Sequence, residues 1–210
     1  METVLDQERP EKSILSSVID HDPGLETLLS ARTRFHRLTA QSRLPFTTPV
    51  GKPETIGADR LALSAAAVHF YPGVNNLVIG LGSCITFNFI NKYGSFLGGS
   101  ISPGMEMRFR SMHAFTAKLP MIQTGNNTAL WNFPLVGYDT RTNLISGVVL
   151  GMATEIDGIM ALYQARYDRL NVLLTGGDAT YFTPFIKSAV TTDPDLIFKG
   201  LYAISEANNP

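Results

Sequence analysis

Four consecutive residues, Gly57-Ala58-Asp59-Arg60, combine types that suit work on a phosphate or an alcohol. They stand at the start of a stretch that favours helix, where unpaired backbone N–H groups attract an anion and Arg60 adds a planar fork of donors. A carboxylate held there, Asp59, suits a general base that takes a proton from an alcohol. The same residues also fit an ordinary helix start, with Asp59 as a first-turn charge and Arg60 in a surface pair.

Two glycine-containing segments further along could approach a phosphate. In the segment from Gly80 to Thr86, glycines would let the backbone come close, and Ser83 or Thr86 could donate a hydroxyl. The alternative is a tight hairpin with glycines at positive φ. Thr175-Gly176-Gly177-Asp178 closes a strand and opens a helix, a common place for a nucleotide in α/β proteins, and Asp178 can also cap that helix. The segment from Gly80 to Thr86 is not a P-loop, because no Gly-Lys-Ser/Thr follows it.

Hydrophobic patterning predicts the elements that must position these segments. The three consecutive strands near the middle of the chain should form an antiparallel meander, and the helix–strand alternation after them argues for α/β layers. Thr140 precedes a long helix, and we expect it to cap that helix or to present its hydroxyl to a ligand. We expect strands at residues 13–19, 35–38, 77–82, 85–91, 96–101, 170–174 and 196–198, and helices at 55–70, 146–163, 179–190 and 201–207. We also expect a short helix at residues 25–29 and another that Pro103-Gly104 opens, with Met105, Phe109 and Met112 on one face.

Composition narrows the class of protein. The chain has 210 residues, 44% hydrophobic and 17% charged, with a net charge of -1, so no global field points to nucleic acid or a membrane. One cysteine, Cys84, excludes an internal disulfide framework. The apolar stretch at residues 145–160 is interrupted by Glu155 and Asp157 and is not expected to span a membrane. The four histidines have no metal-ligand spacing. These features predict a soluble cytoplasmic protein.

The order of several motifs resembles the type III pantothenate kinase family. Pro53-Glu54-Thr55-Ile56-Gly57-Ala58-Asp59-Arg60 looks like that family's Pro-Glu-Thr-Leu-Gly-x-Asp-Arg element. The likeness extends from about residue 13 to 207. Its further matches are Gly98-Gly99-Ser100-Ile101-Ser102-Pro103-Gly104, Thr116-Ala117-Lys118-Leu119-Pro120, Thr140 with Ser146-Gly147, and Thr175-Gly176-Gly177.

The resemblance implies a fold and a reaction. Family members have two ribonuclease H-like domains of the actin-like ATPase superfamily, which here would be residues 1–73 and 74–210. They transfer the γ-phosphate of ATP to pantothenate, the first step of coenzyme A synthesis. They are homodimers with sites at the subunit interface, and they use Mg²⁺ and a monovalent cation, K⁺ or NH₄⁺. We expect no nucleic-acid or membrane partner.

The resemblance also assigns site residues. Asp59 would be the catalytic base for the pantothenate hydroxyl. Gly57, Ala58, Asp59 and Arg60 would line the pantothenate site, and Thr140 would contact pantothenate from the partner subunit. ATP would be bound by Gly82, Ser83, Gly176 and Gly177. No residue is assigned to a metal.

The chain departs from the family pattern at specific positions. No Asp-x-Gly-Asn-Thr strand precedes Ser13, so we expect an N-terminally truncated chain whose first domain is incomplete. Gly80 replaces the carboxylate that binds the monovalent cation, Asn88 replaces an aspartate, and Val50 stands where many members have tyrosine. We expect reduced or abolished turnover. The alternatives are a non-catalytic relative that keeps the fold and the pantothenate-side residues, and a nucleic-acid-binding regulator using the basic stretch at residues 32–43.

Overall fold

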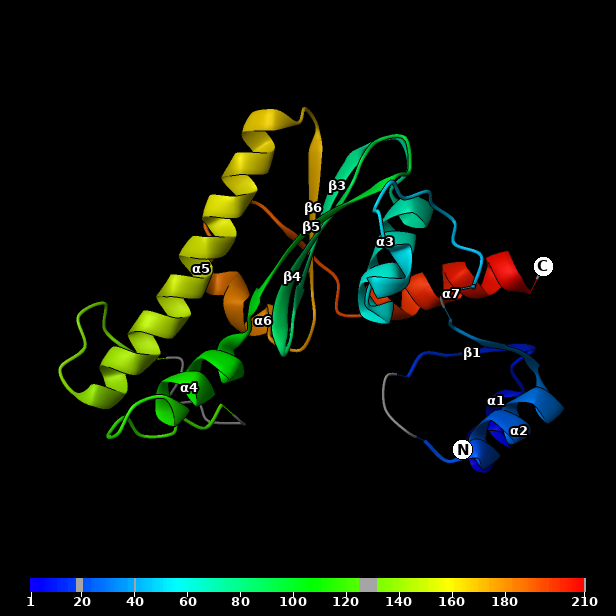
Figure 1. Cartoon of the computed structure of the whole chain (residues 1–210), viewed down its shortest axis with the longest axis horizontal. Coiled ribbons are helices and arrows are strands. Elements are labelled where there is room, and N and C mark those ends of the chain that lie inside the picture. The colour runs from blue at the N-terminus through cyan, green and yellow to red at the C-terminus, as the bar shows by residue number, and fades with distance from the viewer. Residues whose placement is uncertain (18–20, 40, 125–131, 210) are drawn as a thin grey trace. The chain divides into compact units, whose positions relative to one another are not determined.

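The protein is a mixed α/β structure, seen in a computed structural model that describes residues 1–17, 21–39, 41–124 and 132–209 (Figure 1). It divides into two compact units. The first comprises residues 1–74, 88–98 and 195–210, and the second comprises residues 75–87 and 99–194. The division into continuous ribonuclease H-like domains at residues 73 and 74 stays a prediction, because compactness alone does not define a fold family.

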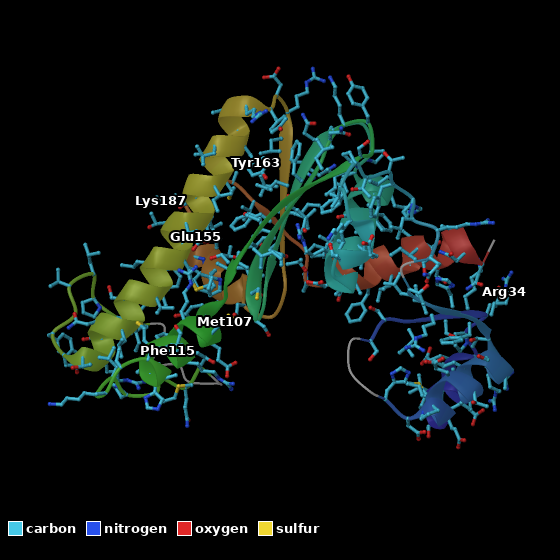
Figure 2. All side chains as sticks on the ribbon, in the orientation of Figure 1. Arg34, Met107, Phe115, Glu155, Tyr163 and Lys187 are labelled. Atoms are coloured by element: carbon cyan, nitrogen blue, oxygen red, sulfur yellow. The ribbon has the colours of Figure 1, made fainter. Side chains whose placement is uncertain are left out.

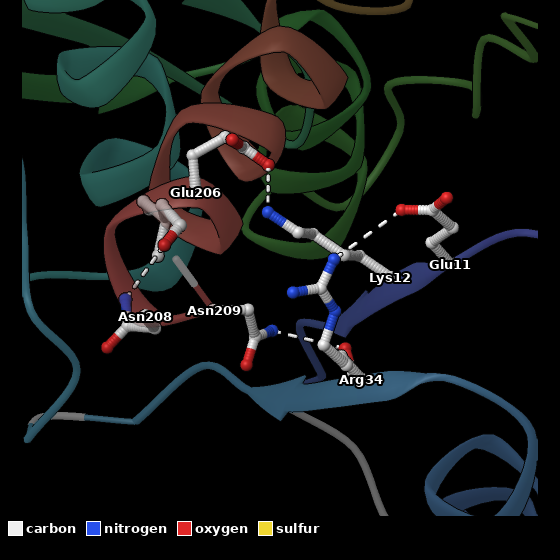
Figure 3. Close-up of polar contacts among 7 residues, drawn as sticks. Glu11, Lys12, Arg34, Glu206, Asn208 and Asn209 are labelled. Atoms are coloured by element: carbon white, nitrogen blue, oxygen red, sulfur yellow. Dashed lines mark hydrogen bonds and ion pairs between the residues drawn. The ribbon is translucent and has the colours of Figure 1, made fainter.

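The first unit begins with a small parallel ribbon that polar contacts tie to the C-terminal helix. Its elements are α1 (Glu2–Glu8), β1 (Lys12–Leu15), α2 (Pro23–Arg32) and β2 (Arg34–Arg37). Strands β1 and β2 pair in parallel, with Lys12 opposite Arg34. The Lys12 ammonium binds the Glu206 carboxylate at 2.7 Å, and the Asn209 side-chain amide donates to the Arg34 carbonyl at 3.1 Å (Figure 3). Both strands were predicted, although β1 ends at Leu15 and residues 18 and 19 of the predicted strand lie outside the described residues. Strand β1 is half-buried rather than fully buried.

Two helices form the core of the first unit. The predicted helix at residues 55–70 is confirmed as α3 (Ala58–Phe70), preceded by a 3-10 turn, Pro53–Thr55. It packs against α7 (Leu196–Asn208) at very close range, since a Cβ at Gly200 would lie 1.8 Å from the Ala62 carbonyl oxygen. The strand predicted at residues 196–198 is wrong. That short apolar run is the first turn of α7, whose buried positions Leu196, Ala203 and Ile204 recur with helical spacing.

A five-stranded sheet has the order β5-β4-β3-β6-β7. The predicted succession of three adjacent strands is confirmed in β3, β4 and β5. Strand β6 pairs in parallel with β3, from Asn75 opposite Leu170 to Gly80 opposite Thr175. The strands are β3 (Asn75–Leu81), β4 (Cys84–Ile90), β5 (Phe96–Pro103), β6 (Leu170–Thr175) and β7 (Thr191–Thr192).

Helices α4 (Met105–Ala114), α5 (Thr140–Arg166) and α6 (Ala179–Phe182) complete the second unit. The long helix is confirmed but extends beyond the predicted residues 146–163. The helix predicted at residues 179–190 is wrong beyond Phe185, because α6 is followed only by a 3-10 turn, Thr183–Phe185. The Asp157 carboxylate then accepts the backbone N–H groups of Lys187 and Ser188 at 3.0 Å each, which takes these donors away from a helix.

Helix α5 is, by length and composition alone, long and apolar enough to cross a membrane. Half of its most apolar 18-residue stretch is buried inside the structure. Val149, Met152 and Ile156 form a buried stripe. Glu155, labelled in Figure 2, pairs with Arg108 of α4. These contacts are those of a helix that forms part of a protein core.

Candidate active site

The Asp59 carboxylate lies over the first residues of its own helix. Gly57 is the N-cap of α3 and brings no side chain, and a Cβ placed there would lie 2.6 Å from Asp59 Oδ1. The carboxylate therefore occupies the space that any other N-cap residue would fill. Asp59 is exposed, and its side chain has no hydrogen bond or ion pair with the residues that the structure describes. A carboxylate in this position is accessible to a ligand that binds at the start of α3.

Arg60 is held inside the first unit, so the expectation of a surface pair is wrong. Its Nε donates to Asn88 Oδ1 at 2.7 Å, and its guanidinium carbon lies 5.5 Å from the centre of the Phe96 ring. Asn88 is completely buried. This hydrogen bond and this aromatic face, both supplied by residues remote in sequence, help to orient the cation.

The turn between β3 and β4 contains Gly82 and Ser83, the predicted ATP-binding residues. The Gly82 N–H donates to the Cys84 carbonyl at 3.1 Å. Neither Gly80 nor Gly82 has a positive φ, so the hairpin exists but not in the conformation expected of it. Small residues here serve to expose the backbone of the turn.

Two further glycines close around this turn. A Cβ at Gly104 would lie 2.1 Å from the Gly82 carbonyl oxygen, and a Cβ at Gly176 would lie 2.1 Å from the Leu81 carbonyl oxygen. Gly176 also has a φ of 101°, which favours glycine. The structure therefore places Gly176 against Leu81, next to Gly82 and Ser83, within the second unit. The part played by Gly104 was missed, although the Pro103-Gly104 dipeptide offered a hint of it.

The described atoms around Ser83 fit a phosphate group. Ser83 is exposed, and its hydroxyl has no partner within the described ranges. A cavity of about 410 Å³ adjoins it, lined also by Glu106, Met107, Arg110 and Phe115 of α4 and its end. Met107 and Phe115 are labelled in Figure 2. Because glycines leave the backbone of this turn uncovered beside the Ser83 hydroxyl, phosphate oxygens can approach it closely.

Asp178 follows Gly176 and Gly177, and the pKa of its carboxyl group is shifted. It stands at the N-cap position of α6, as predicted, but its side chain makes no capping hydrogen bond. Its half-burial, and secondarily the charge of Glu106, raise the pKa of this carboxyl above its usual range. Burial and the neighbouring Asp178 raise the pKa of Tyr181 to about 12. The negative charge of Asp178 is therefore costly in the folded protein.

Thr140 is the first residue of α5 rather than its cap, so the capping interpretation is wrong. Asp139 caps the helix, because its Oδ1 accepts the Thr142 N–H at 2.7 Å while the Thr142 hydroxyl accepts the Asp139 N–H at 3.2 Å. This reciprocal arrangement leaves the exposed Thr140 hydroxyl without a partner among the described residues. Thr140 lines a cavity of about 650 Å³ together with Arg108, Ser111 and Asn143.

The described residues contain no cluster of three or more histidine, cysteine, aspartate or glutamate side chains that could hold a metal. Gly80 pairs with Thr175 in the sheet and offers only backbone. Residues 57–60 belong to the first unit, whereas Thr140 and the glycine-lined turn belong to the second.

Known proteins similar to this chain are type III pantothenate kinases. The type III pantothenate kinase family model matches residues 1–162. A type III pantothenate kinase of Christiangramia forsetii is 38% identical over 197 residues, covering 94% of this chain and 79% of that protein. One from Cytophaga hutchinsonii is 39% identical over 203 residues, covering 96% and 83%. The matched proteins are kinases, which disfavours a non-catalytic relative.

A solved structure from Campylobacter jejuni, named for the Baf family of transcriptional activators, has a TM-score of 0.57 to this chain and 24% identity. It covers 97% of this chain and 88% of its own, and at that identity it shows a shared fold alone. The family matches define the chain as a kinase. More narrowly, it belongs to the type III pantothenate kinase family.

Proposed function

We propose that this protein transfers the γ-phosphate of ATP to the primary hydroxyl of pantothenate, the reaction of its family. One observation carries the proposal: the exposed Asp59 carboxylate, displaced over Gly57 at the head of α3, without a partner among the described residues. In the proposed mechanism Asp59 accepts the hydroxyl proton as the oxygen attacks the γ-phosphorus, and the bond from that phosphorus to the bridging oxygen breaks to release ADP. Arg60 and the backbone of residues 57 and 58 help to bind the acceptor.

The nucleotide phosphates are proposed to lie at the turn made by Gly82 and Ser83, against Gly176 and Gly177. The glycines permit a close backbone approach, and the Ser83 hydroxyl donates to a phosphate oxygen. Mg²⁺ bound together with ATP would supply charge neutralisation for the transferred phosphoryl group. The protein's contribution is to position the reactants and to donate hydrogen bonds, which account for much of the catalysis of phosphoryl transfer.

The monovalent cation fits the described residues poorly. Gly80 has no carboxylate, and its backbone is engaged in the β3–β6 pairing. We therefore assign no step to K⁺ or NH₄⁺ and expect the activity to depend only weakly on either ion. We further propose a cytoplasmic homodimer in which Thr140 reaches the pantothenate bound mainly by the partner subunit. The two-domain ribonuclease H-like architecture belongs to the same proposal.

The proposal is tested by incubating the purified chain with ATP, Mg²⁺ and pantothenate and detecting 4′-phosphopantothenate by mass spectrometry. Product should appear in proportion to enzyme and depend on both substrates. Binding of pantothenate with no product under these conditions would contradict the proposed function.

A further inference from the structure

The Arg108 guanidinium is fixed by three contacts within the second unit. Its Nε donates to the Pro103 carbonyl at 2.8 Å, and its Nη2 donates to Ser102 Oγ at 2.9 Å and to the Glu155 carboxylate. Both charged side chains are about three-quarters buried. These contacts use two of the three guanidinium nitrogens in one fixed orientation, which a lysine ammonium could not reproduce.

The third nitrogen, Nη1, has no hydrogen-bond partner among the described residues. Arg108 lines the cavity of about 650 Å³ that also contains Thr140. It is the one charged side chain on the described lining of that cavity. Ser111 and Asn143 add polar groups, while Leu144 and Val148 add apolar surface. The cavity therefore offers one oriented cationic donor, neutral polar groups and an apolar wall.

Such a lining matches a small, partly apolar molecule that ends in a carboxylate. Pantothenate is of this kind, because it has a primary hydroxyl at one end and a carboxylate at the other. Charge-assisted bonds from Arg to a carboxylate are stronger than bonds from neutral donors. Glu155 already offsets part of the charge of Arg108. The contribution of Arg108 to binding is therefore mainly a hydrogen bond of fixed direction, and less its net charge.

We propose that Arg108 binds the carboxylate of pantothenate in this cavity, beside Thr140, and so selects an anionic acceptor. Glu155 is a positioning residue that orients the guanidinium. The inference rests on the proposed function for the identity of the acceptor. It differs from that proposal in concerning selectivity for the carboxylate rather than transfer of the phosphate.

The test compares binding of pantothenate with binding of pantothenol, in which a primary alcohol replaces the carboxylate. Isothermal titration calorimetry on the full chain measures both dissociation constants without requiring turnover. A hydrogen bond between charged partners corresponds to about a tenfold to hundredfold difference in affinity. The unmodified protein should therefore bind pantothenate at least about tenfold more tightly than pantothenol.

Arg108→Lys keeps a positive charge for Glu155 but loses the free donor. It should weaken pantothenate binding about tenfold while leaving pantothenol binding unchanged. The ratio of the two dissociation constants should therefore approach one. A double variant, Arg108→Gln with Glu155→Gln, leaves no unpaired buried charge and should show the same loss. Arg166→Lys is the matched control, because Arg166 is exposed and lies at the end of α5 against Tyr167. It should retain the full preference.

Equal binding of the two ligands by the unmodified protein would overturn the inference, and so would an unchanged preference in a folded Arg108 variant. Absence of pantothenate binding would overturn it as well. A protein that prefers pantothenate through Arg108 but makes no phosphorylated product would refute the proposed function alone. Phosphorylation with a preference independent of Arg108 would refute this inference alone.

Discussion

Nε of Arg60 donates to Oδ1 of Asn88 at 2.7 Å, so a buried neutral amide receives a charged donor next to the proposed base. Asn88 offers the oxygen acceptor that an aspartate would offer, without the charge. Arg60 is consequently held by this hydrogen bond and by the Phe96 ring, and residue 88 brings no negative charge for an ion pair.

Asn88→Leu should destabilise the first unit. It removes the acceptor while keeping a similar volume, so the charged donor loses a buried hydrogen bond. We expect the free energy of unfolding to fall by about 2–3 kcal/mol in urea denaturation. Asn88→Asp, which retains an acceptor in the same place, should lose less. Equal stabilities for the leucine variant and the unmodified protein would show that the bond contributes nothing.

Gly57→Ala should impair catalysis more than stability. The new Cβ would lie 2.6 Å from Asp59 Oδ1 and must displace the carboxylate. A displacement near one ångström can cost up to about a hundredfold in rate, so we expect kcat to fall about tenfold or more. The stability cost of alanine at this N-cap should be about 1 kcal/mol. Gly51→Ala, at an exposed loop position with open space, is the control and should leave kcat unchanged. An unaltered kcat in Gly57→Ala would argue that Asp59 is not positioned this way.

Gly200→Ala should disrupt the packing of α3 against α7. Its Cβ would meet the Ala62 carbonyl oxygen at 1.8 Å, and backbone cannot yield as a flexible side chain can. We expect a loss of at least about 2 kcal/mol in the free energy of unfolding. Gly158→Ala lies in open space on α5 and should instead stabilise the protein by up to about 1 kcal/mol, because alanine favours helix. The same sign of change in both variants would contradict the close approach.

Asp178→Asn should raise stability near neutral pH. The pKa of Asp178 is raised in the folded protein, so folding binds its proton more tightly than the unfolded chain does. Its favourable contribution is complete below the pKa of the unfolded chain and is lost as pH rises through the folded pKa. The stability difference between the asparagine variant and the unmodified protein should therefore vanish in acid and appear towards neutral pH. Thermal unfolding across pH measures this, with Asp168→Asn, an exposed carboxylate, as the control. A benefit of Asp178→Asn that grows in acid would reverse the expected sign.

Local patterns in the sequence predicted most of the elements around the site. The alanine- and leucine-rich composition of α3 and the β-branched and aromatic residues of β4 are strong enough to set their type. The three-residue run at Leu196 was misassigned, since a short apolar run fits the first turn of a helix as well as a strand. Its long continuation through Ile204 should have favoured helix.

Other features depend on contacts between distant segments and leave no local trace. The Arg60–Asn88 bond joins residues 28 positions apart. The need for glycine at 104 comes from the Gly82 and Ser83 carbonyls, and the orientation of Arg108 comes from Glu155 on another helix. The sequence therefore predicts which elements carry the motifs, while the way each motif is supported required the fold.

The most direct test of the account is the turnover of pantothenate by the unmodified chain and by Asp59→Asn, which keeps the shape of the side chain but cannot accept the proton. Rapid-quench measurement of 4′-phosphopantothenate at saturating ATP and Mg²⁺ gives kcat for each. General bases contribute about a hundredfold to ten-thousandfold, so kcat should fall by at least about a hundredfold while pantothenate binding by calorimetry stays within about threefold. Equal kcat values for the two proteins would contradict the assignment of Asp59 as the base.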